Sequence, residues 1–365
     1  MAYTTIDDPS AYFHTQLYTG NGSTNAITND ANAGDFQPDW LWIKTRSHSS
    51  SHRLMDSSRL ASGEATLSLR SEDSAAESDI ANDGMTSLDS DGFTLNGNGS
   101  GGPVNENSKT YVAWQWKANG GTTASNSNGS ITSTVQANTT AGFSIVTYTG
   151  TGSTATVGHG LGAKPDVYIV KTRSEAQEWM GYFNGTASDP ETDGLRLDTT
   201  DAITDAATFW NDTAPTSSVF TVNTSVNVNK SSATYVAYCF TPIQGYSKFG
   251  SYNGNGNADG PFIYTGFKPA WVMTKRTDTT GNWYIYDSTR NGSSGPDSNQ
   301  VHKILYANDI SAELDNNTRG MDMNANGFKI RNTLNDTNNS SGTYIYMAFA
   351  HHPFVSSEGV PVTAR

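Results

Sequence analysis

Basic residues recur at the ends of three apolar strand-like segments, and they are the clearest candidates for a charged binding site. In each segment a lysine stands six residues after a proline. The six basic residues are Lys44, Arg46, Lys171, Arg173, Lys275 and Arg276. Ammonium and guanidinium groups pair well with carboxylates, so these residues could bind anionic sugars or acidic neighbours in an assembly. The alternative is an internal salt link to acids of the same folding unit.

Two aspartates, Asp56 and Asp287, are candidates for acid-base chemistry. Each lies twelve residues after the lysine of its segment and begins a D-S-x-R pattern that ends at Arg59 or Arg290, whereas the third equivalent position is Phe183. Glycoside hydrolysis needs two carboxyl groups held at a set separation in a cleft, and the sequence shows no such pair. We therefore favour a structural carboxylate that bonds to a turn or to its arginine, and we expect no enzymatic activity.

The sequence gives little reason to expect a metal or a cofactor. The segment 89–92 (DSDG) and the pair Asn326-Gly327 offer oxygen ligands of the kind that calcium prefers, but the terminal bidentate glutamate of a calcium loop is missing. Polar turns are the simpler interpretation. His351 and His352 have no partners at metal-ligand spacing, and a single cysteine, Cys239, excludes an intrachain disulfide.

Three aromatic residues of the middle of the chain, Trp179, Tyr182 and Trp210, are candidates for contact with a glycan or a partner protein. Aromatic rings present an apolar face that can cover the C–H face of a pyranose. The sequence around them departs from the pattern of the other two repeats described below, and such a departure can mark a local task. The alternative is that these rings fill the core.

The elements that must position these residues occur three times. The recurring segments are a strand before a glycine turn (LYTGNGS, TYTGTGS, SYNGNGN), the proline-anchored strand (PDWLWIKTR, PDVYIVKTR, PAWVMTKRT), a Phe-centred strand (GFTLN, VFTVN, GFKIR) and a closing strand (TYVAWQW, TYVAYCF, TYIYMAF). Repeated order of this kind indicates repeated folding units. We expect a first repeat at 1–117, a flexible polar linker at 118–128, a second repeat at 129–242, a third repeat at 245–354 and a tail at 355–365.

Each repeat is expected to be an antiparallel β-sandwich or jelly roll with six to eight short strands. Abundant glycine, asparagine, serine and threonine supply turns, and helix-period segments are short. In the closing strand, alternate positions stay large and apolar, with Trp116, Phe240 and Phe349 as the last residue of each copy. Because side chains alternate across a strand, this face should lie in the core of each repeat.

Charge and hydropathy narrow the class of protein further. The net charge of −13 over 365 residues repels polyanions and disfavours nucleic-acid binding. No run of apolar residues is long enough to span a membrane, and the first residues do not form a signal peptide. We therefore expect a soluble all-β protein without membrane insertion.

The repeated segments resemble a family of virion proteins found in marine tailed bacteriophages of the cyanophage and pelagiphage type. The resemblance lies in the segment Gly129 to Ser174, in NWYIYDSTRN at Asn282 to Asn291, and in NGFKIRN with GTYIYMAFAHHPF up to Phe354. It implies lectin-like β-sandwich repeats in a non-enzymatic structural protein on the virion surface, made in the host cytoplasm.

The resemblance leaves two roles open. One is a tail-fibre or appendage component that contacts a host surface glycan, and the other is a capsid decoration or scaffold protein that binds only other virion proteins. A homo-oligomer is expected in either case, and the length of the chain fits a short knob or decoration better than a whole fibre.

Overall fold

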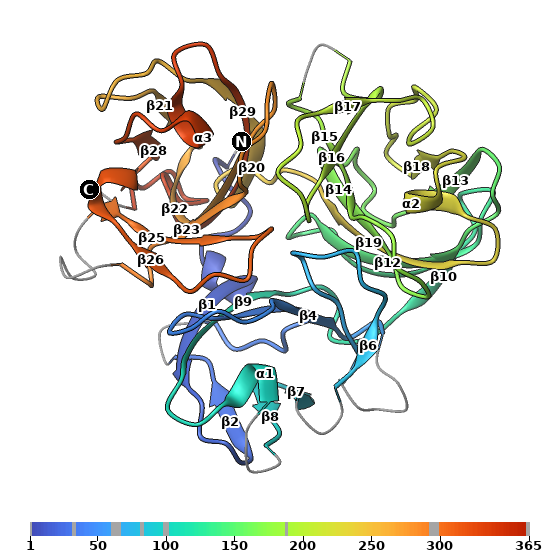
Figure 1. Cartoon of the computed structure of the whole chain (residues 1–365), viewed down its shortest axis with the longest axis horizontal. Helices are drawn as coiled ribbons and strands as arrows, with labels where there is room; N and C mark the ends of the chain where they lie inside the picture. The colour runs from blue at the N-terminus through green and yellow to red at the C-terminus, as the bar shows by residue number, and fades with distance from the viewer. Residues whose placement is uncertain are drawn as a thin grey trace.

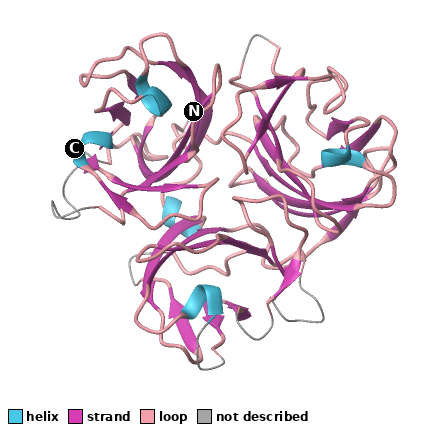
Figure 2. Ribbon diagram, in the orientation of Figure 1, coloured by secondary structure: helices cyan, strands magenta, loops and turns pink. Residues whose placement is uncertain are grey.

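The protein is all-β, with several antiparallel sheets and three helices of four residues among the residues that the structure describes. A computed structural model describes residues 2–30, 34–59, 67–80, 84–97, 102–186, 189–291 and 299–362. Every strand pair within the sheets is antiparallel, as the turn-rich sequence predicts. Strands and the loops between them make up most of the described chain (Figure 2). The sheets contain strands from one sequence repeat at a time, so no described sheet crosses from one repeat into the next.

The larger sheet in the first repeat has the order β1-β9-β3-β4, and smaller sheets are β2-β8-β7 and β5-β6. The strands are β1 (Phe13–Thr19), β2 (Asn25–Thr28), β3 (Trp40–Thr45), β4 (Arg53–Asp56), β5 (Leu67–Ser68), β6 (Ser78–Asp79), β7 (Met85–Asp89), β8 (Gly92–Leu95) and β9 (Thr110–Trp116), with helix α1 (Gly102–Asn105) and the 3-10 turn η1 (Pro9–Ala11). The closing strand β9 lies between β1 and the proline-anchored strand β3.

The same order returns in the second repeat, where β19 lies between β12 and β14 in the sheet β10-β11-β12-β19-β14-β15-β16-β17, opposite the pair β13-β18. The elements are β10 (Ala124–Asn126), β11 (Ser133–Asn138), β12 (Phe143–Thr149), β13 (Ala155–Gly158), β14 (Val167–Thr172), β15 (Met180–Phe183), β16 (Asp193–Arg196), β17 (Thr204–Asp205), β18 (Val219–Val222), α2 (Val226–Asn229) and β19 (Thr234–Phe240).

The third repeat places β29 between β20 and β22 in the sheet β20-β29-β22-β23-β25-β26, and its smaller sheet is β21-β28-β27-β24. The elements are β20 (Ser247–Asn253), β21 (Phe262–Tyr264), β22 (Phe267–Arg276), β23 (Tyr284–Asp287), β24 (Gln300–Val301), β25 (Lys303–Tyr306), β26 (Leu314–Asp315), η2 (Asn317–Arg319), β27 (Met321–Asn324), β28 (Gly327–Ile330), α3 (Asn335–Asn338) and β29 (Thr343–Pro353).

A separate apolar cluster lies between the larger and the smaller sheet of each repeat. In the first repeat, for example, Ile27 and Phe93 of the smaller sheet pack with Leu41, Ile43 and Tyr111 of the larger sheet. Corresponding clusters occur in the second and third repeats. Alternation along each strand assigns one set of side chains to this cluster and the other set to the opposite face of the larger sheet.

That opposite face is not exposed, because the larger sheets of all three repeats meet around one central core. Figure 1 shows the three lobes of the chain arranged around a common centre. Trp116, Phe240 and Phe349 are each about 1% exposed and lie in this core, with ring centroids 5.6 Å apart for Trp116 and Phe349 and 5.8 Å for Phe240 and Phe349. The large apolar face of the closing strand is therefore buried, but between repeats rather than inside each repeat.

The backbone of the segment 118–128 is hydrogen-bonded to the first and second repeats, although most of its residues are exposed and its small polar composition predicts a flexible linker. Its residues 124–126 form β10, which pairs with β11. The carboxylate of Asp39 accepts hydrogen bonds from the backbone N–H groups of Ala118, Gly120 and Gly121 at 2.6 to 2.9 Å. Backbone donors and one buried acceptor thus replace the apolar contacts that the sequence lacks here.

Candidate functional site

The three lysines of the proline-anchored strands are buried at the contacts between repeats. Each is fully buried, and each Nζ donates to the carbonyl of the following residue and to a carbonyl of another repeat. The acceptors in the other repeat are Ile310 for Lys44 at 3.0 Å, Ser74 for Lys171 at 3.2 Å and Thr200 for Lys275 at 3.2 Å. Burial lowers the pKa of each lysine to about 8. These lysines bind backbone, so they are not available to an anionic sugar.

The cross-repeat bonds run in one rotational direction. The first repeat donates to the third, the second to the first, and the third to the second. A ring N–H eight residues after each lysine follows the same direction, with Trp179 donating to the carbonyl of Arg70 at 2.7 Å and Trp283 to that of Arg196 at 2.8 Å. His52 takes this place in the first repeat, where its Nδ1 accepts from Trp42 and its Nε2 lies 2.9 Å from the carbonyl of Tyr306. The three contacts are therefore equivalent joints of a closed ring.

Asp56 and Arg59 lie in a buried ionic network that closes the first–second joint. The Asp56 carboxylate pairs with Arg59 at 2.5 Å and accepts from the Tyr238 hydroxyl at 2.7 Å, and Arg59 also pairs with Glu77 at 2.5 Å. Arg173 of the second repeat completes the network through Glu77 at 2.9 Å. Burial raises the pKa of the Glu77 carboxyl, but the two arginines outweigh this effect and hold the pKa below its usual value.

The first–third joint repeats this network with different residues. Asp287 pairs with Arg290 at 2.5 Å, and Arg290 lies 3.2 Å from Glu313, which Arg46 binds through two nitrogens at 2.8 and 2.9 Å. Trp114 takes the place of Tyr238 and donates from Nε1 to Asp287 at 3.0 Å. Both aspartates are thus structural carboxylates, as the D-S-x-R pattern indicates. Arg46 and Arg173 do form internal salt links, but with acids of another repeat.

The second–third joint is apolar at the same positions. Phe183 and Thr186 stand where the other joints have aspartate and arginine, and Ile203 stands at the glutamate position. The main-chain bond survives, with Ile203 N donating to Thr277 O at 3.0 Å, as Glu77 N does to Arg173 O at 2.9 Å. Phe183 packs against Trp283 with ring centroids 5.5 Å apart. Arg276 pairs instead with Asp278 of its own repeat at 2.8 Å.

The aromatic residues predicted for glycan contact are inside the protein. Trp179, Tyr182 and Trp210 are fully buried. Trp179 lies in the central core, and the other two lie between the sheets of the second repeat, where Tyr168 stacks on Tyr182 with centroids 4.7 Å apart. A ring without an exposed face cannot cover a sugar, so the prediction of a glycan site here is wrong. The structure supports the core-filling alternative.

The most perturbed carboxyl of the joints also has a structural explanation. Burial raises the pKa of Asp198 to about 7, which is a value suited to acid-base chemistry. Its carboxylate accepts the backbone N–H of Trp179 at 3.2 Å, and Glu72 and Asn308 accept the equivalent N–H groups of His52 and Trp283. Since all three repeats place a side-chain oxygen here, the carboxyl positions the ring residue of its joint.

The described residues hold no group of three or more side chains that could ligate a metal ion. In the polar turn at 89–92, Asp89 accepts from Ser87 and Thr94 at 2.7 Å. The backbone of Asn326 accepts from the N–H groups of Thr265 and Gly266. His351 and His352 are exposed near the end of β29. None of the helices that the structure describes has the length and apolarity that a membrane span requires.

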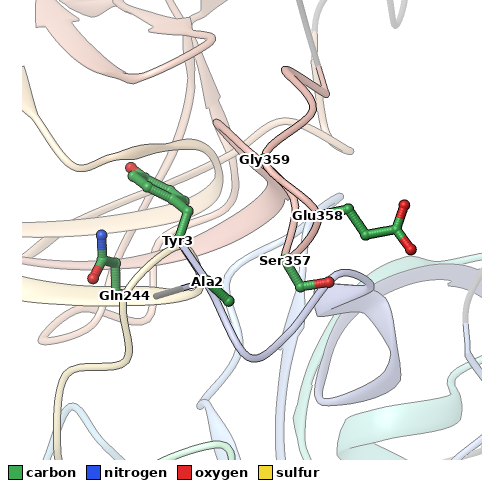
Figure 3. A pocket seen from close by; sticks show the side chains of 6 residues that line it. All are labelled: Ala2, Tyr3, Gln244, Ser357, Glu358 and Gly359. Atoms are coloured by element: carbon green, nitrogen blue, oxygen red, sulfur yellow. The ribbon is translucent and has the colours of Figure 1, made fainter.

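The described residues also form exposed features that the sequence analysis does not predict, and two of them lie side by side. An open cavity of about 590 Å³ lies where the two ends of the chain meet the connection between the second and third repeats (Figure 3). Its lining residues are Ala2, Tyr3, Gln244, Ser357, Glu358 and Gly359. Beside it, Phe262 and Tyr264 of β21 are 45% and 50% exposed. Strand β21 is three residues long and lies outside the recurring sequence segments, so the sequence alone offers no alignment that would single out this aromatic pair.

Comparison with known proteins identifies the family but not an activity. A family model described as a domain of unknown function, DUF7483, matches residues 8–353. No curated protein and no solved structure matches the chain. Because the family model spans all three repeats, the chain belongs to the DUF7483 family.

Proposed function

We propose that this chain is a non-enzymatic structural protein on the surface of a tailed-phage virion, as a tail-fibre or appendage component that contacts the host surface. The main support is the closed ring of three repeats around one aromatic core. A ring of this kind is a stiff building block, since each repeat is held by two neighbours and cannot swing on a linker. The resemblance of the repeated segments to marine phage virion proteins supports the same assignment.

The placement of the reactive side chains favours a structural role over a catalytic one. Asp56, Asp287 and the three lysines are the residues whose spacing suggests chemistry, and all five are bonded inside the joints. A depolymerase is the competing enzyme class, and it would need two carboxyl groups in an open groove. Incubation of the protein with soluble host polysaccharide, followed by an assay for new reducing ends, separates the two classes. We expect no new ends, and depolymerisation would overturn the proposal.

Location on the particle tests the proposal most directly. Purified virions should contain the protein, and gold-labelled antibody should mark the tail or its appendages on intact particles. Labelling spread over the head would support the alternative role of a capsid decoration that binds only virion subunits. Absence of the protein from purified particles would overturn both virion roles.

A further inference from the structure

We propose that the outward face of β21 and β28 in the third repeat binds an acidic polysaccharide built of pyranose rings. The inference rests on the proposed function and names the ligand class for the host contact. In β21, Ile263 faces the core and is 7% exposed, whereas Phe262 and Tyr264 point outward on the same face. Two residues along a strand are about 7 Å apart, so a chain of two or more sugar rings can contact both side chains.

The aromatic pair is specific to the third repeat. Strand pairing aligns Ile263, Ile27 and Val157, because each lies opposite the Phe of the Phe-centred strand. Phe262 then corresponds to Ala26 and Thr156, and Tyr264 corresponds to Thr28 and Gly158. The fold of the repeat therefore requires no aromatic residue at these positions, and neither of the first two repeats has an exposed aromatic pair there.

The third repeat also carries lysine and arginine near this aromatic pair, at positions where the first two repeats have neither. Lys329 lies opposite Phe262 in the strand pair, where the other repeats have Thr94 and Thr221. Arg331, two residues further on, replaces Asn96 and Asn223. Lys248 replaces His14 and Ser144 in the first strand of the larger sheet. In a protein with a net charge of −13, three added cations on one face favour an anionic ligand over a neutral one.

Neighbouring groups hold the tyrosine in place and leave part of its surface open. The Lys248 Nζ lies 5.2 Å from the centroid of the Tyr264 ring and donates to the Tyr264 carbonyl at 2.8 Å. The Tyr3 hydroxyl lies 3.3 Å from the Tyr264 hydroxyl and donates to the carbonyl of Gly266 at 2.8 Å. Lys329 pairs with Asp259 and Arg331 pairs with both Asp259 and Asp322, whereas no ion pair to Lys248 occurs in the described parts of the chain. The three cations therefore outnumber the two acids that pair with them. A prepositioned ring beside a cation lacking an acidic partner is suited to a sugar carboxylate.

The corresponding strand of the second repeat, β13, is covered by the segment that precedes β11. The third repeat has no such cover in the described part of the chain. There Val157 forms a bridge with Ile131, and the N–H groups of Ser130 and Thr156 each donate to the hydroxyl of the other residue at 2.9 Å. A side chain at Gly158 would meet Asn126. In the third repeat β21 has β28 as its one strand partner among the described residues, so its outer edge and face are accessible.

Affinity electrophoresis of the full chain tests the site with three polymers. Polygalacturonate supplies acidic pyranose rings, dextran supplies neutral rings, and polyacrylate supplies carboxylates without rings. We expect polygalacturonate to retard the protein at concentrations at least tenfold lower than either of the others. The double substitution Phe262→Thr with Tyr264→Thr should abolish most of that retardation, and Lys248→Ser with Lys329→Thr should do the same. These substitutions introduce residues that the other repeats carry, so the fold should be preserved, and an unchanged thermal transition checks this.

The control is Val226→Thr, at an exposed apolar residue of the second repeat, which should bind like the wild type. Equal retardation by polyacrylate, no retardation by polygalacturonate, or full binding by the Phe262/Tyr264 variant would overturn the proposal. So would a dimer that the same variant dissociates in analytical ultracentrifugation, because a second copy would then occupy the face.

Phage carrying the Phe262/Tyr264 variant separates failure of this inference from failure of the proposed function. The inference predicts particles that retain the protein and adsorb at least tenfold more slowly to host cells. Particles that retain the protein and adsorb normally would overturn the glycan site alone. Absence of the wild-type protein from the particle would overturn the proposed function, independently of the result of the affinity electrophoresis.

Discussion

Two joints of the ring are closed by buried ion networks and the third by apolar side chains, although all three use the same strands. Aspartate, arginine and glutamate on one side match a tyrosine or tryptophan donor and an arginine on the other side. At the second–third joint Phe183 and Ile203 are matched by Met347 and Thr277, and Phe183, Met347 and Ile203 all contribute to the central core. The charged residues of the ionic joints are therefore all replaced together in the second–third joint. A single carboxylate or guanidinium left buried there would have no partner of opposite charge.

The comparison also shows that the ion networks are not needed to close a joint. A buried ion pair loses hydration, and an apolar set of similar volume is often as stable or more stable. The main-chain bond, the buried lysine and the ring N–H are common to all three joints. These shared bonds fix how the repeats are placed at each joint. The residues that vary fill the remaining space of the joint with either an ion network or apolar side chains.

The largest expected effect comes from removing one charge from an ionic joint. Arg59→Met leaves Asp56 and Glu77 buried without their cation, and it should lower the free energy of unfolding by about 3–5 kcal/mol. Thr186→Met, at the equivalent position of the apolar joint, should change it by less than about 1 kcal/mol. Urea denaturation of both variants measures the difference. Equal effects would show that the two kinds of joint do not differ energetically.

An effect of similar size is expected from truncating a side chain of the central core, to which all three repeats contribute. Ala in place of Trp116, Phe240 or Phe349 should cost about 3–5 kcal/mol each, the usual range for a buried aromatic side chain. The same denaturation experiment measures it. A cost under about 1 kcal/mol for any of the three would mean that its repeat does not depend on the shared core.

The buried lysines predict a pH dependence. Their pKa values of about 8 lie below the ordinary 10.5, so the unfolded chain binds more protons than the folded chain between these values. The free energy of unfolding should therefore gain up to about 1.4 kcal/mol per pH unit from each lysine as the pH rises from 8 to 10. Burial raises the pKa values of Cys239 and of tyrosines such as Tyr148 and Tyr168, which opposes this gain.

Lys171→Met isolates the contribution of one lysine, because Cys239 and the buried tyrosines act equally in both proteins. Urea denaturation at pH 8, 9 and 10 should give a slope against pH that is smaller in the variant by the share of one lysine. An identical slope in the variant and the wild type would contradict burial of the charge at the joint.

The smallest loss of stability is expected when a whole joint is exchanged. Asp56→Phe, Arg59→Thr, Glu77→Ile, Arg173→Thr and Tyr238→Met together give the first–second joint the residues of the second–third joint. The stability should be equal to that of the wild type or higher by up to about 4 kcal/mol. A loss as large as that of Arg59→Met alone would show that the two joints differ in backbone geometry as well as in side chains.

The sequence predicts the all-β class, the recurring strands and the structural role of Asp56 and Asp287, because alternation and turn residues are local signals. It does not predict that the large apolar face of Trp116 and its counterparts lies between repeats. An apolar face requires burial, but the sequence pattern does not show whether it packs against the same repeat or against another repeat. For the same reason the sequence leaves glycan contact and core filling both open for Trp179 and Tyr182, and the structure places Trp179 in the central core and Tyr182 between the sheets of the second repeat.

The basic residues illustrate a second limit. Lysine at the end of a strand suggests a solvated charge, and the carbonyls that bind Lys44 and Lys171 lie far away in the sequence. The exposed pair Phe262 and Tyr264 was overlooked because its strand is only three residues long and is not among the recurring segments. Strand register from the structure was needed to align it with the other repeats.

Differential scanning calorimetry of the full chain tests most directly whether the three repeats form one body around one core. We predict a single transition with a calorimetric enthalpy equal to the van't Hoff enthalpy, since no repeat can keep its side of the central core after another has left. Arg59→Met should move that whole transition. Separate transitions, or a calorimetric enthalpy close to three times the van't Hoff value, would contradict the shared core and show that the repeats unfold independently.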